Sequence, residues 1–225
     1  MPTPINPKTD ALIVIDVQND FIPGGSLAVS GGDEIISGIV ELAEKFDTII
    51  LSQDWHPAGH KSFASSHGAE PFTQTQMPYG EQTLWPDHCV QGTRGAQFHD
   101  DLIDVVNRSA LIVRKGMNPE VDSYSAFFEN DQTTTTGLAG WLREKGIQRV
   151  FIVGLAYDFC AGFSALDAKR VGFQAVVVRD LARAIAAPVG EGKTSEGEMD
   201  SQLDQAGVAI QYHNPRPSRT ISRPV

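Results

Sequence analysis

A continuous run of apolar, mostly β-branched residues near the start of the chain constrains the fold more than any other feature. Residues 11–17 read ALIVIDV, without the alternation of apolar and polar side chains that marks a strand with one face in water. Such a run is typical of a strand buried on both faces, as in parallel sheets covered by helices on each side. The chain is therefore expected to be an α/β protein.

The rest of the chain alternates short apolar runs with helical patterns. The runs that predict further strands cover residues 48–51, 110–113, 149–153, 174–178 and 208–211. The patterns that predict helices cover residues 33–46, with Asp33 as the capping residue, 98–106, 134–145, 159–170 and 196–205. Strands that alternate with helices form βαβ units with right-handed crossovers. We therefore expect a mostly parallel central sheet with helices on both faces, in a Rossmann-like three-layer fold.

Length and composition fit one domain. The chain has 225 residues, of which 41% are hydrophobic and 20% charged, and these are ordinary values for a globular domain. No internal repeat or change of composition marks a second domain. We predict a single domain over residues 1–213, followed by a Pro- and Arg-rich C-terminal tail over residues 214–225 that frays.

The charge and the cysteines limit the classes of partner and the compartment. The net charge of −10 repels the phosphates of nucleic acids and of anionic membranes. No window approaches the roughly 18 apolar residues of a membrane span, and residues 1–10 contain no apolar run of signal-peptide length. The two cysteines, Cys89 and Cys160, fit free thiols better than a disulfide. We expect a soluble, cytoplasmic protein with a small-molecule partner and no nucleic-acid or membrane partner; the sequence leaves a homo-oligomer open.

Chemically active side chains follow four of the expected strands. In open α/β sheets, ligands bind beyond the carboxyl ends of the strands, so residues at these positions meet at one edge. The side chains at these strand ends are Asp16, the pair Asp54 and His56, Lys115, and Cys160. Their convergence predicts a site at this edge of the sheet.

Three of these residues form a plausible hydrolytic set. Cys160 falls in the first turn of an expected helix, where backbone N–H groups stabilise a thiolate and a developing oxyanion. The charge of Lys115 lowers the pKa of the cysteine, and Asp16 can take the thiol proton and pass it to departing ammonia. Each residue has an ordinary alternative: a core cysteine, a solvated lysine and a capping aspartate. Together they favour a cysteine amidohydrolase.

A second group of residues has the donor atoms of a metal site. Asp54 and His56 lie two residues apart, which places both side chains on one face of an extended segment. Further histidines follow in the long segment 53–95, for which we expect irregular structure and a functional role. Oxygen and imidazole ligands suit zinc, iron or manganese. The alternative is a set of loop histidines that only form hydrogen bonds. Cys89 could be a ligand, but we favour a core residue.

One glycine-rich stretch resembles a phosphate-binding loop but fails the pattern. Gly192-Lys193-Thr194 matches the end of a Walker motif, yet Ala187 stands where the motif needs its first glycine. No strong strand directly precedes the stretch. We therefore expect no nucleotide site there.

Six segments, in order along the chain, carry a resemblance to a known family. They are residues 16–25 (DVQNDFIPGG), 52–57 (SQDWHP), 84–90 (LWPDHCV), 114–116 (RKG), 122–127 (DSYSAF) and 154–160 (GLAYDFC). With these segments the chain resembles the nicotinamidases, also called pyrazinamidases, of the isochorismatase-like hydrolase superfamily. The resemblance implies the isochorismatase-like fold and an enzyme that converts nicotinamide to nicotinate and ammonia in NAD salvage, with pyrazinamide as a side substrate.

The resemblance also implies roles for individual residues. Cys160 would attack the amide carbon and form a thioester, Asp16 would shuttle the proton, and Lys115 would stabilise the thiolate. The backbone N–H groups of Ala156 and Cys160 would form the oxyanion hole, with a cis peptide bond before Ala156. The residues that would wall the pocket for the aromatic ring are Phe21, Trp85 and Tyr124.

The resemblance further implies one divalent metal ion, held by Asp54, His56 and His88, which binds the pyridine nitrogen and orients the ring. Zinc is the expected ion, with Fe²⁺ and Mn²⁺ as alternatives. His60 lies where some members of the family supply a further ligand and others do not, so the ligand set leaves it out.

Two departures from the family pattern keep other functions open. Tyr157 stands where the family usually has threonine, which moves the hydroxyl outward, and Ala161-Gly162 follow the cysteine where the family often has valine, which is expected to loosen the packing there. The alternatives are another amidohydrolase of the superfamily, acting on a ureido acid or a maleamate-like substrate, and a non-catalytic metal-binding relative.

Overall fold

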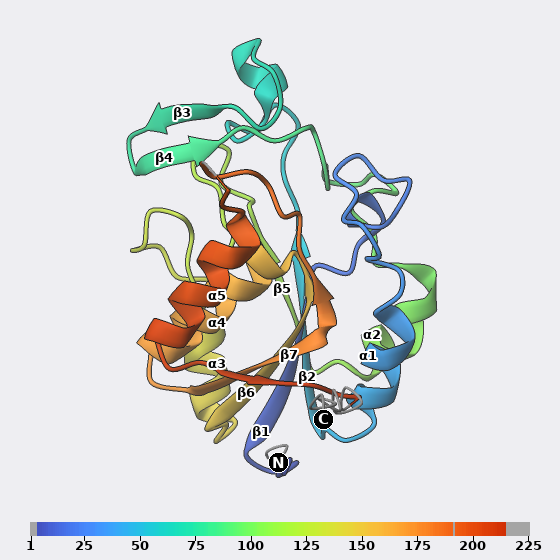
Figure 1. The fold of residues 1–225 in the computed structure, drawn as a ribbon. Helices are drawn as coiled ribbons and strands as arrows, with labels where there is room; N and C mark the ends of the chain where they lie inside the picture. The colour runs from blue at the N-terminus through green and yellow to red at the C-terminus, as the bar shows by residue number, and fades with distance from the viewer. Residues whose placement is uncertain (1–3, 191, 215–225) are drawn as a thin grey trace, which may run out of the picture.

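The computed structural model describes residues 4–190 and 192–214, which fold around one parallel sheet (Figure 1). Its strands pair in the order β5-β2-β1-β6-β7-β8, and every neighbouring pair is parallel. The strands are β1 (Asp10–Ile15), β2 (Thr48–Asp54), β5 (Leu111–Lys115), β6 (Arg149–Leu155), β7 (Gln174–Arg183) and β8 (Ala209–Gln211). The predicted α/β fold with a parallel central sheet is confirmed.

The apolar run that predicted this fold lies at the centre of the sheet. All six residues of β1 are buried, and Ile13 pairs with Ile50 on one side and Ile152 on the other. Alternate side chains of a strand point to opposite faces. Leu12 and Val14 accordingly belong to one apolar cluster, whereas Ile13 belongs to a second cluster across the sheet. Continuous apolarity is thus the consequence of two buried faces.

Helices cover both faces (Figure 1). The first cluster receives the apolar side chains of α1 (Ile36–Ala43) and α2 (Ile103–Arg108), and the short 3-10 helix η3 (Asp100–Leu102) leads into α2. The second receives those of α3 (Leu138–Glu144), α4 (Gly162–Arg170) and α5 (Ser195–Gln205). The sheet is therefore the middle layer of three, as the sequence predicted.

Two expected helix starts were wrong. The helix expected from Asp33 begins at Ile36, and the residue at its N-cap position is Ile35, which provides no side-chain cap. The helix expected from Thr134 begins only at Leu138, because the Asp131 carboxylate accepts hydrogen bonds from the backbone of Thr134 and holds a separate turn. In the second case the hydrogen bonds of Asp131 compete with the first helical turn.

The long segment between β2 and β5 is more ordered than we expected. It contains the 3-10 helix η2 (Ala64–His67) and an antiparallel hairpin of β3 (Gln74–Met77) and β4 (Gly80–Thr83), which extends beyond the carboxyl ends of the parallel strands (Figure 1). Its strands read QTQM and GEQT, and most of their side chains are exposed or half-buried. A hairpin with no apolar face lacks the alternation from which strands are predicted.

Apart from Asn214, the expected C-terminal tail lies outside the described residues. Among the helices in the described part of the chain, none combines the length and the apolar character needed to cross a bilayer.

Candidate functional site

The parallel strands bring the side chains expected at four strand ends together at one edge of the sheet. Asp16 directly follows β1, with a positive φ of 47°, and Asp54 and Lys115 are the last residues of β2 and β5. Beyond β6 the chain forms a π-helical turn, η4 (Tyr157–Ala161), which carries Cys160 in front of α4. Residues more than 140 positions apart in sequence are therefore neighbours.

The ammonium group of Lys115 is the centre of this group. Its Nζ lies 2.8 Å from Asp16 Oδ2 and 2.8 Å from Asp54 Oδ1, and it donates to the backbone oxygen of Ser123 at 2.9 Å. The Sγ of Cys160 is 3.4 Å from the same nitrogen. Burial alone would lower the pKa of Lys115, but the two carboxylates outweigh it and hold that pKa well above its ordinary value. The lysine is a fixed, buried cation.

The carboxylate of Asp16 is held by two contacts. Ser52 Oγ donates to Oδ1 at 2.7 Å, and Oδ2 lies 2.8 Å from Lys115 Nζ in an ion pair. Burial raises the pKa of Asp16 despite the opposing charge of Lys115. A buried carboxylate of raised pKa is a stronger base than an exposed one, which suits it to accept a proton from a thiol.

The thiol of Cys160 differs from our expectation in two ways. It lies in a π-helical turn, where the N–H of Ala161 bonds the oxygen of Ala156 at 3.0 Å, and not in the first turn of an α-helix. Burial raises the pKa of Cys160 well above its ordinary value, and the charge of Lys115 reduces this effect without reversing it. The resting group is therefore a neutral thiol that needs a base to become a nucleophile.

The predicted oxyanion-hole residues lie beside the thiol. The peptide bond between Leu155 and Ala156 is cis, as the resemblance implied. Ala156 and Cys160 both line the same narrow pocket.

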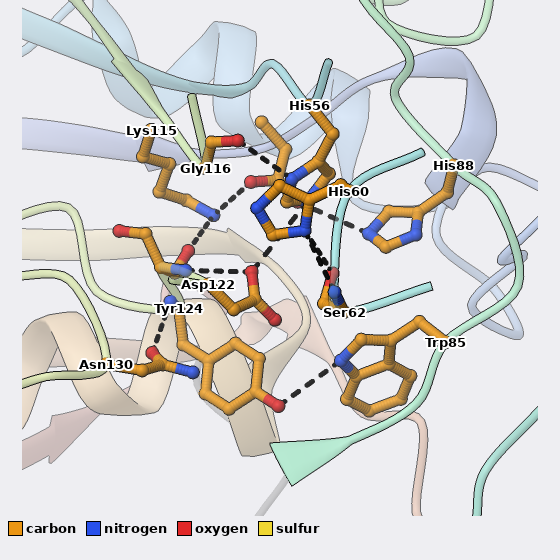
Figure 2. A network of polar contacts seen from close by, with 12 residues as sticks. His56, His60, Ser62, Trp85, His88, Lys115, Gly116, Asp122, Tyr124 and Asn130 are labelled. Carbon is orange, nitrogen blue, oxygen red and sulfur yellow. Dashed lines mark hydrogen bonds and ion pairs between the residues drawn. The ribbon is translucent and has the colours of Figure 1, made fainter. Parts of the chain in front are cut away.

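The three predicted metal ligands form one buried cluster, of which Figure 2 labels His56 and His88. One donor atom from each of Asp54, His56 and His88 lies within 4.8 Å of the other two. His56 Nε2 is 3.1 Å and His88 Nε2 is 3.4 Å from Asp54 Oδ2. Since Asp54 Oδ1 contacts Lys115, this single carboxylate joins the cluster to the thiol group.

Hydrogen bonds to the backbone orient both imidazoles toward that carboxylate. His56 Nδ1 is 3.0 Å from the oxygen of Gly116, and His88 Nδ1 is 2.8 Å from that of Pro86. An imidazole that donates from Nδ1 presents the lone pair of Nε2, which is the arrangement typical of metal-binding histidines. Two such nitrogens and a carboxylate oxygen fit a divalent ion.

Gly116 is required at its position by the imidazole that it orients. Its φ is +66°, and a Cβ atom there would lie 2.4 Å from Cε1 of His56. Any larger residue would push the imidazole away from Asp54, so this glycine supports the cluster.

His60 lies next to the cluster but is engaged elsewhere. Its ring centroid is 4.4 Å from that of His56, and it could form a second group with His56 and Asp122. The backbone N–H of Ser62 donates to its Nδ1 at 3.1 Å, so its Nε2 carries the proton, 2.7 Å from the oxygen of Asn118. Because both ring nitrogens have hydrogen-bond partners, His60 packs against the ring of His56 and supports the cluster from outside.

The expected aromatic residues line a small pocket above the thiol. Trp85 Nε1 donates to the hydroxyl oxygen of Tyr124 at 3.2 Å (Figure 2). The Phe21 ring lies 5.4 Å from that of His88. The residues that line the pocket are Phe21, Leu27, Asp54, Trp85, His88, Asp122, Tyr124, Ala156, Cys160 and Ile185. A flat ring held here would have the cluster on one side and the thiol on another.

Several residues that support the site were not predicted. Gln18 accepts from the backbone N–H of Asp54 at 2.7 Å and donates to its backbone oxygen at 2.8 Å. Gln82, on the unpredicted hairpin, donates to Asp122 at 2.9 Å and to Tyr124 at 3.1 Å. Nothing in the sequence distinguishes these glutamines from solvated ones. Ser52, which bonds Asp16, is the exception, because a small polar residue follows the apolar run of its strand.

The two departures from the family pattern are linked in space. Tyr157 is fully buried, its hydroxyl donates to Asp200 on α5, and the guanidinium of Arg179 lies 4.0 Å from its ring centroid. The hydroxyl is thus bonded to α5. Gly162 does not loosen the packing, since a Cβ atom there would lie 2.4 Å from Sδ of Met199. The absence of a side chain at Gly162 instead allows Met199 of α5 to pack closely there.

Comparison with known proteins extends these observations. The profile of the isochorismatase domain matches residues 10–194. A nicotinamidase from Acinetobacter baylyi is 54% identical over 176 residues, which are 78% of this chain and 81% of that protein. A nicotinamidase from Escherichia coli is 45% identical over 179 residues, or 78% of this chain and 83% of that protein.

Solved structures agree with the sequence relatives. A nicotinamidase/pyrazinamidase from Acinetobacter baumanii superposes with a TM-score of 0.87 at 46% identity, covering 93% of this chain and 98% of that one. A protein from L. infantum in complex with nicotinate has a TM-score of 0.79 at 39% identity, covering 94% and 96%. A pyrazinamidase from Pyrococcus horikoshii in complex with zinc has a TM-score of 0.70 at 34% identity, covering 90% and 98%.

Proposed function

The chain belongs to the isochorismatase family, and on that premise we propose that it is a nicotinamidase, which hydrolyses nicotinamide to nicotinate and ammonia. The proposal rests on one observation: the cysteine thiol and the predicted metal ligands Asp54 and His88 lie at different walls of the same pocket. The thiol of Cys160, with Lys115 and Asp16, lies at one wall, and the cluster of Asp54 and His88 lies at another. The nicotinamidase names of the relatives and the nicotinate in a similar structure agree with it.

The first half of the reaction transfers the acyl group to the cysteine. Asp16 accepts the thiol proton as Cys160 Sγ bonds to the amide carbon, and the backbone N–H groups of Ala156 and Cys160 stabilise the oxyanion. The C–N bond then breaks, and Asp16 returns its proton to the departing nitrogen, which leaves as ammonia. A thioester of nicotinate remains on Cys160.

The second half releases the product. A water molecule gives its proton to Asp16 and bonds to the thioester carbon, and the C–S bond breaks as the tetrahedral intermediate collapses. Asp16 then returns the proton to the sulfur, which restores the neutral thiol. Throughout the cycle Lys115 holds Asp16 in place, and it compensates the charge of Asp16 whenever that carboxylate is ionised, because both groups are buried in the protein.

The residues of the cluster would hold one divalent ion, for which zinc is our first proposal. When bound, the ion supplies a Lewis acid that can accept the lone pair of a ring nitrogen. Phe21, Trp85 and Tyr124 would pack against the ring. We further propose that the enzyme serves NAD salvage in the cytoplasm, accepts pyrazinamide as a side substrate, and uses no nucleic-acid or membrane partner; a homo-oligomer stays open.

A direct assay tests the function. Purified protein, analysed for its metal content and supplied with Zn²⁺, Fe²⁺ or Mn²⁺ in turn, is incubated with nicotinamide, and ammonia and nicotinate are measured together. We expect equal amounts of both products, and loss of both in Cys160→Ala. If the metal-loaded protein releases no ammonia from nicotinamide, the proposal is wrong, and a ureido acid and a maleamate become the substrates to test.

A further inference from the structure

A second cavity adjoins the pocket for the ring. It lies between the hairpin and the segment 185–189, and its volume exceeds that of the ring pocket. Its lining is largely apolar and includes Phe72 and Val189, which are among the exposed large hydrophobic residues of the described chain. The cavity is thus a larger and more open space than the site itself.

Two residues line both spaces, Trp85 and Ile185, and together they form the partition between them. Trp85 is fixed on several sides, since its indole bonds Tyr124 and its ring contacts Phe159 with a centroid distance of 4.9 Å. Ile185 is half-buried and packs against the core cluster through an aliphatic side chain alone. The removable part of the partition is therefore Ile185.

The backbone of Ile185 is fixed relative to the thiol. The carboxylate of Asp158, two residues before Cys160, accepts hydrogen bonds from the N–H of Ile185 at 2.9 Å and of Ala186 at 2.8 Å. The same carboxylate accepts from Ser195 Oγ at 2.5 Å. A buried carboxylate with three donors is rigid, so the π-helical turn and the partition keep a constant separation.

From this arrangement we propose that Ile185 is the specificity-determining residue that limits the substrate to small ring amides. The second cavity is a latent subsite for an apolar substituent on the ring, and the side chain of Ile185 closes it. The inference rests on the proposed function, because it takes the amide group to lie at Cys160. The substrate class that the enlarged site would accept is that of alkyl- or aryl-substituted pyridine carboxamides.

The physical reason is that a ring substituent binds differently with and without the Ile185 side chain in its path. A substituent that meets a fixed side chain in a closed pocket loses binding to overlap, whereas one that enters an apolar cavity gains contact with Phe72 and Phe159. One methylene of mismatch in an apolar pocket changes kcat/KM by about 10- to 200-fold. Shortening Ile185 removes three carbon atoms from the partition.

The experiment compares Ile185→Ala and Ile185→Val with the wild type. The substrates are nicotinamide and a set of nicotinamides that carry one methyl, ethyl or phenyl group at each free ring carbon in turn. We expect Ile185→Ala to raise the ratio of kcat/KM for at least one substituted amide over that for nicotinamide by about tenfold or more, with Ile185→Val between it and the wild type. The matched control is Ile210→Ala, an exposed isoleucine on β8, which should leave every ratio unchanged.

The outcomes separate this inference from the proposed function. A wild type that fails to hydrolyse nicotinamide contradicts the function itself. A wild type that hydrolyses nicotinamide, together with Ile185 variants whose ratios equal those of the wild type for every substituted amide, contradicts only the role of Ile185. If Ile185→Ala does not fold, as judged by circular dichroism, Ile185→Val decides: an unchanged ratio overturns the inference, and a raised one supports it.

Discussion

Two side chains of this site, Asp54 and Lys115, contact residues of both the hydrolytic set and the predicted metal site. Asp54 offers one oxygen to Lys115 and the other to the imidazoles of His56 and His88. Lys115 in turn contacts Asp54, Asp16 and the thiol. Sequence reasoning treated the hydrolytic set and the metal set as separate, whereas the structure joins them through one ion pair. A change at Lys115 should therefore affect both.

We expect Lys115→Met to leave two buried carboxylates without a cation. Breaking a buried pair in this way costs about 3–5 kcal/mol in the free energy of unfolding. We also expect kcat/KM for nicotinamide to fall by about 100-fold or more, together with a change in metal affinity. Denaturant unfolding, ammonia release and metal titration measure these effects. Lys45→Met, at an exposed lysine, is the control, and equal behaviour of the two variants would contradict the role of Lys115.

The pH dependence of the reaction should report Asp16. Burial raises its pKa above the ordinary 3.8, and below the raised pKa the carboxyl group is protonated and cannot accept the thiol proton. kcat/KM should therefore fall, as the pH is lowered, at a higher pH than for an ordinary aspartate. Ser52→Ala removes a hydrogen bond that stabilises the carboxylate, so it should move this fall to still higher pH. A fall at or below pH 3.8, or a shift in the opposite direction, would refute the assignment.

At the level of elements, the turn that carries the nucleophile is held from two directions. The π-helical turn η4 is fastened to α5 through Tyr157 and Asp200, and to the segment that walls the pocket through Asp158. α5 packs closely at Gly162, the first residue of α4. The position of the thiol therefore depends on a helix that contributes no residue to the pocket.

Two glycine substitutions test this packing. In Gly162→Ala the new methyl group would lie 2.4 Å from Sδ of Met199 and 2.6 Å from the backbone oxygen of Tyr157. We expect a loss of about 1–3 kcal/mol in the free energy of unfolding. Gly140→Ala, within α3, meets no atom within 4 Å and should gain about 0.5–1 kcal/mol, since alanine favours helices. Thermal or urea unfolding measures both, and a stabilised Gly162→Ala would refute the packing argument.

For the whole molecule, the parallel sheet decides where the chemistry lies. Because all six strands run in one direction, their carboxyl ends meet, and the segment between β2 and β5 folds over them. The cluster of Asp54, His56 and His88 joins the end of β2 to this segment, and the loop after β5 orients His56 through the backbone oxygen of Gly116. A bound ion would thus connect parts of the chain that are distant in sequence.

Metal removal should therefore lower global stability. An ion at 1,000 times its dissociation constant stabilises the folded state by about 4 kcal/mol, so chelation should lower the Tm of the metal-loaded wild type. Gly116→Ala displaces His56 and should weaken binding by about 10- to 100-fold, so less chelator should suffice. The control is Gly59→Ala. The φ of Gly59 is also positive, but a Cβ atom there would meet no atom within 4 Å. If the Gly116 and Gly59 variants lose their metal at the same chelator concentration, backbone strain explains the weaker metal binding. That result would contradict the role of Gly116 in placing His56.

The fold class and most of the candidate site could be predicted from the sequence, because the patterns that indicate them lie within short segments of the chain. The apolar run of β1 predicted a sheet buried on both faces, and strand ends predicted which side chains would meet. Asp16, Lys115 and Cys160 could be proposed in this way, since the position of a strand end depends only on the chain near it. The hairpin and the starts of α1 and α3 could not, because polar strands and competing turns leave no periodic signal.

The tertiary structure alone decided the electrostatics and the limits of the pocket. Whether Cys160 rests as a thiol or a thiolate depends on burial by segments far away in the chain, and burial outweighs the neighbouring lysine. Gln18, Gln82 and Ile185 acquire their positions only when separate elements pack together. A sequence specifies which groups are present and where strands and helices begin to form. The distances that set a pKa or close a pocket exist only once the layers are assembled, because electrostatic and packing energies depend on separation in space.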